Sequence, residues 1–258
     1  MKTTQKHPSA QKHGPIENLF DGIWFVQGGV KMPMWMPMHI SRSMTVVKDL
    51  QNGHLCLFNS MRLSEAGLAE LEKLGPIKHV IRLGGFHGRD DGFYRDRYGA
   101  QIWAFRGQVY TRKLDAETTE NYMEPDHWIE DEDQPLPLSD LSIKIIKSSK
   151  PVEALVLVDR NGGILVSGDA LQNTPQPDQF VNFLARLMMK KMGFFKAYNI
   201  GPGWLQFAKP DQAEVRSIAD LTFEHVLPGH GKPVIGQARQ KYLPALTGPL
   251  KGCHDKSA

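Results

Sequence analysis

The chain has 258 residues, of which 41% are hydrophobic and 23% are charged. These values are typical of globular proteins, so they exclude a disordered chain, a fibrous repeat and a disulfide-stapled miniprotein. The formal net charge of +3 is small for this length, so we expect neither nucleic acid nor a membrane as a partner. With ten His and only two Cys, a metal site would have to be built from His and carboxylate side chains.

The two ends of the chain are polar. Residues 1–16 lack the apolar core of a secretory signal, and no window reaches the roughly 18 apolar residues of a membrane span. Cys56 and Cys253 are too few and too far apart in sequence for a disulfide framework. We therefore expect a soluble, cytoplasmic protein with a flexible polar leader over 1–16, one domain over 17–250 and a polar tail over 251–258.

The first half of the chain is rich in strand signals. Runs of β-branched and apolar residues predict strands at 23–30, 43–48, 54–58, 77–83 and 101–105. Helices are predicted at 64–74, where Ser64 can cap the first turn, and at 89–98. The segment 31–40 (KMPMWMPMHI) contains four Met, one Trp and two Pro, and its prolines predict an irregular apolar loop.

The second half begins with an acidic, proline-broken connection over 120–137, which predicts a loop. Further strands are predicted at 141–146, 153–158, 164–167 and 224–227, and helices at 178–198, 211–221 and 237–246, the last shortened by Pro244. No internal repeat or linker divides the chain. Two sheets with helices on both outer faces would accommodate this order, which indicates an α/β domain of four layers.

Three segments share one pattern, in which a buried strand ends and glycines introduce a His or an Asp. They are 84–91 (GGFHGRDD), 166–170 (VSGDA) and 226–231 (VLPGHG). Each is a weak signal alone, because Gly-His-Gly and Gly-Asp are more often turns or helix caps. Strand ends are nevertheless where ligands usually bind, and two imidazoles with one to three carboxylates suit Zn²⁺, Fe²⁺ or Mn²⁺.

The order and strand contexts of these segments resemble the metallo-β-lactamase-fold hydrolases, over about 19–246. The segment 164–173 (ILVSGDALQN) is similar to the one that supplies a metal-bridging Asp in that family, and 227–231 (LPGHG) to a later turn that often supplies a His. The hairpin 153–167 lies where the family's hairpin precedes its Asp. The resemblance implies a four-layer αββα sandwich and a metal-dependent hydrolase.

The family's central motif, His-x-His-x-Asp-His, is incomplete in this chain. With His87 on the first His, Asp91 falls on the Asp. Arg89 then takes the place of the second His, and Gly92 that of the last. An alignment shifted by two residues retains fewer ligand types, and the family's next His falls on serine. The resemblance therefore implies a divergent branch with a reduced ligand set.

The ligand set that the resemblance leaves is His87, Asp91, Asp169 and His230, with Asp91 and Asp169 as the catalytic carboxylates. Two metal ions usually need about six protein ligands. The cation of Arg89 would also repel a second dication, by about 4 kcal/mol per unit charge of that ion at a separation of about 4 Å and an effective dielectric constant of about 20. We therefore expect one divalent metal, zinc or else iron or manganese, or none. In the metal-free alternative, Arg89 forms a salt bridge with Asp169 or Asp91.

The expected activity is attack by a metal-activated water on an ester-, lactone- or ether-like bond of a small, largely apolar substrate. Trp35, Arg89 and Tyr94 are the candidate substrate-binding residues, with packing as the alternative role of Tyr94. The alternative function is a metal-free or partner-dependent, non-catalytic subunit that serves binding or assembly. The Met-rich segment 31–40 is a candidate apolar surface, either a lip of the substrate site or the interface of a homo- or hetero-oligomer.

Overall fold

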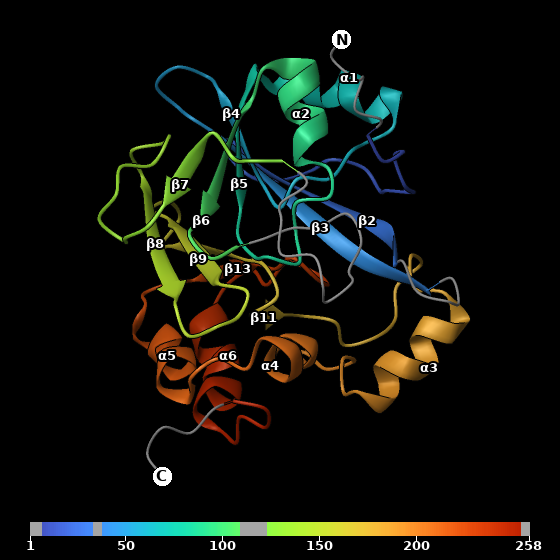
Figure 1. Ribbon diagram of the computed structural model, residues 1–258, viewed down its shortest axis with the longest axis vertical. Helices are drawn as coiled ribbons and strands as arrows, with labels where there is room; N and C mark the ends of the chain where they lie inside the picture. The colour runs from blue at the N-terminus through green and yellow to red at the C-terminus, as the bar shows by residue number, and fades with distance from the viewer. Residues whose placement is uncertain (1–6, 33–37, 109–122, 254–258) are drawn as a thin grey trace.

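The computed structural model describes residues 7–32, 38–108 and 123–253 of the chain (Figure 1). Within these residues, the largest sheet has seven strands that follow one another in chain order from edge to edge. They are β1 (Glu17–Phe20), β2 (Ile23–Met32), β3 (Met38–Lys48), β4 (Leu55–Phe58), β5 (Ile77–Arg82), β6 (Gln101–Phe105) and β7 (His127–Ile129). Neighbours from β1 to β4 are antiparallel, and those from β4 to β7 are parallel.

A second sheet, with four strands in the described part of the chain, has the order β13-β10-β9-β8. Its strands are β8 (Leu141–Ile146), β9 (Glu153–Val158), β10 (Ile164–Ser167) and β13 (His225–Leu227), and a separate short pair joins β11 (Leu171–Gln172) to β12 (Asn199–Ile200). Strands β10 and β13 are parallel, with Val166 opposite Leu227. The loops that follow these two strands therefore leave the sheet side by side.

Helices cover the outer face of each sheet (Figure 1). The first sheet is covered by α1 (Glu65–Leu74) and α2 (Asp91–Tyr98); the second by α4 (Pro202–Ala208), α5 (Gln212–Ser217), the 3-10 turn Ile218–Asp220 and α6 (Ala238–Thr247). A further helix, α3 (Phe183–Lys191), lies apart from these and packs against β3. None of the helices in the described residues is long and apolar enough to cross a membrane.

Buried apolar side chains fill each space between these layers. Phe25 and Val156 belong to the layer between the two sheets. Leu68 of α1 belongs to the layer above the first sheet, and Trp204 of α4 to the layer beneath the second. The four-layer αββα sandwich expected from the sequence is therefore confirmed.

Most predicted strands are present, but two predicted loops contain strands. Strands β2 and β3 extend into the Met-rich segment as far as the pair Met32 and Met38. The ladder continues because both prolines of this segment, Pro33 and Pro37, fall beyond it, outside the described residues. In the acidic connection, β7 pairs with β6, and the acidic and proline-rich composition around this short strand concealed it.

The predicted helices differ mainly at their ends. Ser64 caps α1 as expected, since its hydroxyl accepts a hydrogen bond from the Gly67 N–H at 3.2 Å. The helix predicted over 178–198 is shorter, because Asn182 caps its start and Gly193 adopts a left-handed φ of 78° after its end. Pro244 lies within α6 rather than shortening it.

The described part of the predicted leader, residues 7–16, lies against the domain. The Gly14 N–H donates to the Gln27 carbonyl of β2 at 2.8 Å. The His13 Nε2 lies 2.9 Å from the Ser64 hydroxyl at the start of α1. These contacts attach this segment to the first sheet and its helical layer.

Candidate metal centre

Three of the predicted ligands meet where the two sheets face each other. His87 follows β5, Asp169 follows β10 and His230 follows β13. One ligand atom from each lies within 4.8 Å of the others, and in the described residues this is the one such group of His, Cys, Asp or Glu. The first sheet therefore supplies one ligand and the second sheet supplies two.

The Asp169 carboxylate lies between the two imidazoles. Its Oδ1 is 3.0 Å from the His230 Nε2, and its Oδ2 is 3.3 Å from the His87 Nε2. The two imidazole rings are 5.7 Å apart, measured between their centroids. All three side chains therefore direct a lone-pair atom into one small volume.

Glycines allow the Asp169 and His230 loops to approach closely. The Gly229 N–H donates to the Gly168 carbonyl at 3.2 Å, and a Cβ on Gly229 would lie only 2.6 Å from that carbonyl oxygen. Gly231 has a φ of +92°, and a Cβ there would lie 2.0 Å from the Asn173 carbonyl oxygen. Any larger residue at either position would push the two loops apart.

The orientation of His230 is fixed by the first sheet. Its Nδ1 lies 2.7 Å from the Ser41 carbonyl of β3, which can only accept, so Nδ1 carries the proton. When the ring is neutral, its lone pair is on Nε2, which faces Asp169. When the ring is protonated, Nε2 donates a hydrogen bond to the Asp169 Oδ1 at 3.0 Å. Backbone support of this kind is usual for a metal-binding His. Burial lowers the pKa of His230, but its bond to Asp169 outweighs this and raises the pKa overall.

Asp169 is held in its ionised form. Burial on its own would raise the pKa of this carboxyl, but the neighbouring His87 and His230 hold the pKa well below its usual range. A metal ligand must be deprotonated, so the environment prepares this side chain for a cation.

A buried acid beneath the group, Glu153, was missed by sequence reasoning. Its Oε1 accepts the N–H groups of Asp169 at 2.6 Å and Ala170 at 3.0 Å, and the residue is 1% exposed. Burial, reinforced by the charge of Asp169, raises the pKa of Glu153. The signal in the sequence was a single Glu opening an otherwise apolar strand (EALVLV), since a buried acid requires a partner.

The residues of this group fit a divalent metal ion. The His87 Nε2 and the Asp169 Oδ2 are buried, and neither has a hydrogen-bond partner among the described residues. Buried polar atoms without partners are rare, and here two of them face each other. Imidazole nitrogen and carboxylate oxygen are ligands that Zn²⁺, Fe²⁺ and Mn²⁺ accept.

The structure does not bring Asp91, the fourth predicted ligand and second catalytic carboxylate, to this group. Its Oδ2 accepts from the Arg82 Nε at 2.9 Å, and its Oδ1 accepts from the Ser60 hydroxyl at 2.7 Å. Both members of the pair with Arg82 are completely buried. This corrects the prediction, because both oxygens of Asp91 are already engaged by protein donors.

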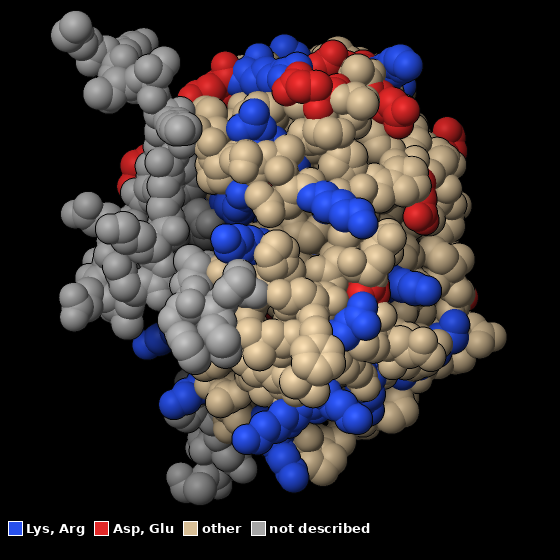
Figure 2. Space-filling model, turned by 90° about the vertical axis from the view of Figure 1, so that its right-hand side faces the viewer, with Lys and Arg blue, Asp and Glu red and all other residues tan. Residues whose placement is uncertain are grey.

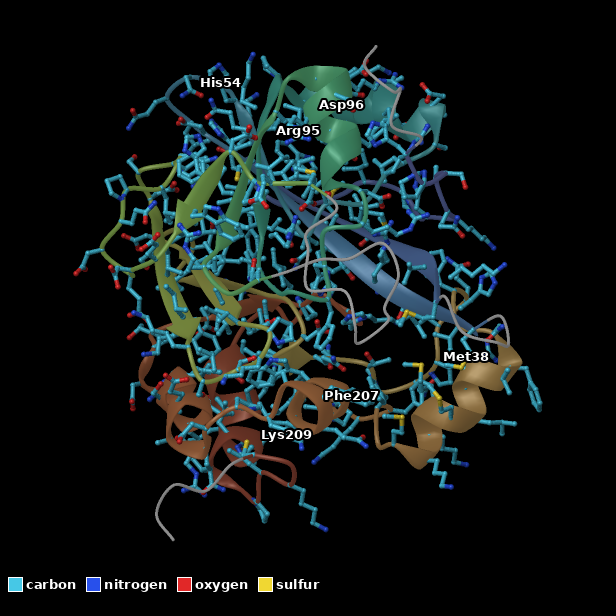
Figure 3. The ribbon with its side chains drawn as sticks, in the orientation of Figure 1. Met38, His54, Arg95, Asp96, Phe207 and Lys209 are labelled. Carbon is cyan, nitrogen blue, oxygen red and sulfur yellow. The ribbon has the colours of Figure 1, made fainter. Side chains whose placement is uncertain are left out.

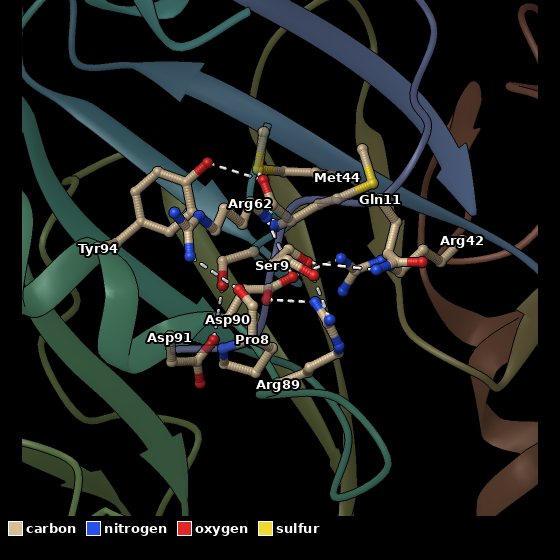
Figure 4. A network of polar contacts seen from close by, with 12 residues as sticks. Pro8, Ser9, Gln11, Arg42, Met44, Arg62, Arg89, Asp90, Asp91 and Tyr94 are labelled. Atoms are coloured by element: carbon tan, nitrogen blue, oxygen red, sulfur yellow. Dashed lines mark hydrogen bonds and ion pairs between the residues drawn. The ribbon is translucent and has the colours of Figure 1, made fainter. Parts of the chain in front are cut away.

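Arg89 and its neighbours form a polar network beside the group (Figure 4). The Arg89 Nη1 lies 2.6 Å from the Asp90 Oδ1, and its Nη2 donates to the Ser9 carbonyl at 3.0 Å. Arg42 of β3 also pairs with Asp90, which is completely buried. Arg89 therefore pairs with Asp90, whereas the metal-free alternative required a salt bridge to Asp169 or Asp91.

The remaining substrate-binding candidates are not placed at the group. Tyr94 is completely buried, and its hydroxyl donates to the Met61 carbonyl at 2.7 Å, which corrects its predicted contact with substrate. Its role is the packing alternative. Trp35 lies outside the described residues.

Comparisons with known proteins are informative at the level of structure. A scan of the sequence against models of protein families finds no match, and a comparison with curated proteins finds none either. Solved structures do match over most of the chain. The metallo-β-lactamase from Hirschia baltica is 18% identical, with a TM-score of 0.55, and the match covers 92% of this chain and 99% of that one. The chain has the metallo-β-lactamase fold.

Two further structures with this fold give the same result. The metallo-β-lactamase FIM-1 from Pseudomonas aeruginosa, solved in its mono-zinc form, is 12% identical over 93% of this chain and 96% of that one, with a TM-score of 0.59. VMB-1 is 13% identical over 92% of this chain and 98% of that one, with a TM-score of 0.62. Identities this low establish the architecture, and the activity must be argued from the residues of the site.

Proposed function

We propose that this protein is a metal-dependent hydrolase in which His87, Asp169 and His230 hold one divalent ion. The observation that carries the proposal is the pair of buried atoms without hydrogen bonds, the His87 Nε2 and the Asp169 Oδ2, which face each other at 3.3 Å. The metallo-β-lactamase fold supports it, and so does the mono-zinc form of FIM-1, a protein with the same architecture.

Two of the three ligands, His230 and Asp169, are held in place by contacts with other parts of the chain. The Ser41 carbonyl fixes the His230 ring, and Glu153 fixes the loop of Asp169 through two backbone N–H groups. A bound ion of this kind lowers the pKa of a coordinated water and polarises the bond to be cleaved. Asp169 is the catalytic carboxylate in this proposal, since it balances the charge of the cation and remains ionised.

A single ion is proposed because two further carboxylates of the motif segment pair with arginines. Asp91, on the motif position where the resemblance implied a ligand, is paired with Arg82. Arg42 is 6% exposed, and its charge lowers the pKa of His230. Arg42 and Arg82 thus engage the carboxylates Asp90 and Asp91, and the three ligands that remain are fewer than two ions need.

The substrate proposed is small and largely apolar, with an ester-, lactone- or ether-like bond. Support comes from the composition of the segment 31–40, which holds four Met and one Trp and is typical of an adaptable apolar surface. Met-rich clusters adapt to apolar ligands of different shapes. Aryl esters, lactones and aryl ethers, with a phosphodiester as the contrasting class, are the compounds to assay.

Metal content provides the first test. We expect elemental analysis of the protein, purified without added metal, or calorimetric titration of chelator-treated protein with Zn²⁺, to give about one equivalent. Asp169→Asn and His230→Ala should lose this ion, and hydrolysis with it. His54→Gln is the matched control, because His54 lies in the turn before β4, away from the three ligands (Figure 3).

Less than about a tenth of an equivalent, with no Zn²⁺ uptake on titration, would contradict the proposal. The non-catalytic binding or assembly subunit would then be the better description. Uptake of two equivalents would instead contradict the argument that the three remaining ligands are too few for a second ion.

A further inference from the structure

Helix α3 has an apolar face that nothing in the described residues covers. Ala185 and Met189 are buried against β3, on the side of the helix that faces the domain. Phe183 and Leu187 lie one turn apart on another side, and they are 76% and 55% exposed. Two large apolar side chains adjacent on one exposed helix are more than scattered surface residues and indicate a binding surface.

Positive charge accompanies this apolar face. Residues 179–210 contain five basic and no acidic residues, although the whole chain is nearly balanced. The five, all exposed, are Arg186, Lys190, Lys191, Lys196 and Lys209. Figure 2 views the molecule from the side on which α3 lies in Figure 1. Lys and Arg are spread over this face, whereas Asp and Glu lie mostly on its upper part, so the lower part carries basic residues with few acidic ones.

A groove beside α3 extends the same combination. Its volume is about 630 Å³, and its lining includes the apolar Ile200 and Leu205 together with Lys196, Lys209 and Lys251. In the described part of the chain, none of these lysines has a carboxylate within 4.0 Å. Lysine ammonium groups beside apolar lining residues fit a ligand that carries both an anionic group and a hydrocarbon portion.

Another exposed aromatic side chain lies on α4, next in the chain to Gln206, which lines this groove. Phe207 of α4 is 63% exposed and lies two residues before Lys209 (Figure 3). The surface formed by α3, the groove and Phe207 is called the basic-apolar face below. It repeats one arrangement in two places, an exposed large apolar side chain next to basic side chains that form no ion pair within the described residues.

We propose that the basic-apolar face docks on an anionic phospholipid surface. Helices that lie in a membrane interface insert Phe and Leu between the lipids while Lys and Arg contact the headgroups. Juxtaposed cations are attracted by the negative surface potential of anionic lipids. The small net charge of the whole chain, which argued against a membrane partner, conceals this local concentration.

Two other occupants fit less well. A symmetric contact with a second copy would bring the five cations against the same five, which costs energy unless acidic residues surround them. A nucleic acid would use the cations but not the exposed Phe183 and Leu187, since phosphate contacts come from polar and charged groups.

Vesicle co-sedimentation of the full-length protein tests the proposal. We expect binding to vesicles of phosphatidylglycerol mixed with phosphatidylcholine, weakening as salt is added, and little binding to phosphatidylcholine alone. Lys190→Gln combined with Lys191→Gln should reduce partition by about five-fold per charge. Phe183→Ser combined with Leu187→Ser should reduce it at least as much, with an unchanged circular dichroism spectrum because both side chains are exposed.

Matched controls remove the same chemistry from elsewhere on the surface. Lys73→Gln with Lys78→Gln removes two exposed charges near α1, and Leu50→Ser removes a leucine that is 61% exposed. Both controls should bind vesicles like the natural sequence. The protein concentration is kept where light scattering shows no change of mass.

Three outcomes would overturn the proposal. One is no partition onto anionic vesicles at low salt, and another is partition that the controls reduce as strongly as the α3 variants. The third is the absence of vesicle binding together with self-association, or with binding of a duplex DNA fragment, that is lost in the α3 variants. The first of these outcomes does not affect the proposed hydrolase, whose metal content is measured without lipid.

Discussion

Asp169, which follows β10, and Asp91, which opens α2, are both buried carboxylates, yet their surroundings are opposite. Both oxygens of Asp91 are engaged, one by Arg82 and one by Ser60. Asp169 receives one bond from His230, and its second oxygen has no hydrogen bond and faces an imidazole that also lacks one. A carboxylate whose two oxygens both accept hydrogen bonds from the protein, here called saturated, stabilises the fold. A carboxylate with a free oxygen beside other lone pairs, here called unsaturated, can bind a ligand.

Replacing Asp91 by Ala should have the largest effect on stability. It leaves the Arg82 guanidinium, which is completely buried, without this partner, and breaking a buried ion pair costs about 3–5 kcal/mol. For a chain of this size the melting temperature should fall by about 2–4 °C per kcal/mol. Differential scanning calorimetry of chelator-treated protein measures this.

Asp169→Asn provides the contrast under the same conditions. It should change the melting temperature much less while removing metal uptake, because its partners are two histidines that can be neutral. Equal destabilisation by the two variants would erase the distinction between the saturated and the unsaturated carboxylate.

Glu153 should have an intermediate effect, and a pair of variants separates its possible roles. Glu153→Leu leaves the N–H groups of Asp169 and Ala170 without their acceptor, which should cost about 2–3 kcal/mol. It should also weaken metal binding about 10–100-fold, since the Asp169 loop loses its support. Calorimetric unfolding and Zn²⁺ titration measure the two effects.

Glu153→Gln is the conservative partner of that variant. It keeps an acceptor of the same shape, and burial already raises the pKa of Glu153 toward the neutral form. We therefore expect a change in stability of less than about 1 kcal/mol and a nearly normal affinity for Zn²⁺. A Gln variant as damaged as the Leu variant would show that the negative charge, rather than the acceptor, is needed.

Ser60→Ala should have the smallest effect. It removes one of the two donors to Asp91 and leaves the bond with Arg82, so the expected cost is about 1 kcal/mol. Metal content should be unchanged, and this distinguishes the Asp91 environment from the metal centre. A loss of metal in this variant would mean that the two carboxylates are coupled after all.

The sequence predicted the layers of the fold well, because apolar strand runs and glycine turns are local signals. Of the four ligands predicted, three lie together in the structure. Two of these, Asp169 and His230, could be anticipated because Gly-Asp and Gly-His follow two parallel strands, whose loops leave the sheet side by side. The assignment of Asp91 rested on its place in the incomplete motif of the family that the chain resembles. A local signal pointed the other way: Arg82 ends a buried strand, and a buried arginine requires a carboxylate.

Other features were beyond the sequence for physical reasons. The Ser41 carbonyl that orients His230 is a backbone group 189 positions away, and residue type does not identify it. The excess of basic residues over 179–210 is visible in the sequence, but the placement of these residues on one face with Phe183, Leu187 and the groove depends on the packing of α3 and α4. Lys251 joins it only because the C-terminal segment returns to the groove.

The division of the ligands between the two sheets gives the metal centre a role in chain entropy. His87 and Asp169 are 82 positions apart in the sequence, and one ion that holds both would close a loop of that length. By analogy with a covalent cross-link, closing so long a loop restricts the unfolded chain by about 3–5 kcal/mol. The same ion would then cross-link the seven-stranded sheet, which supplies His87, to the four-stranded sheet, which supplies Asp169 and His230.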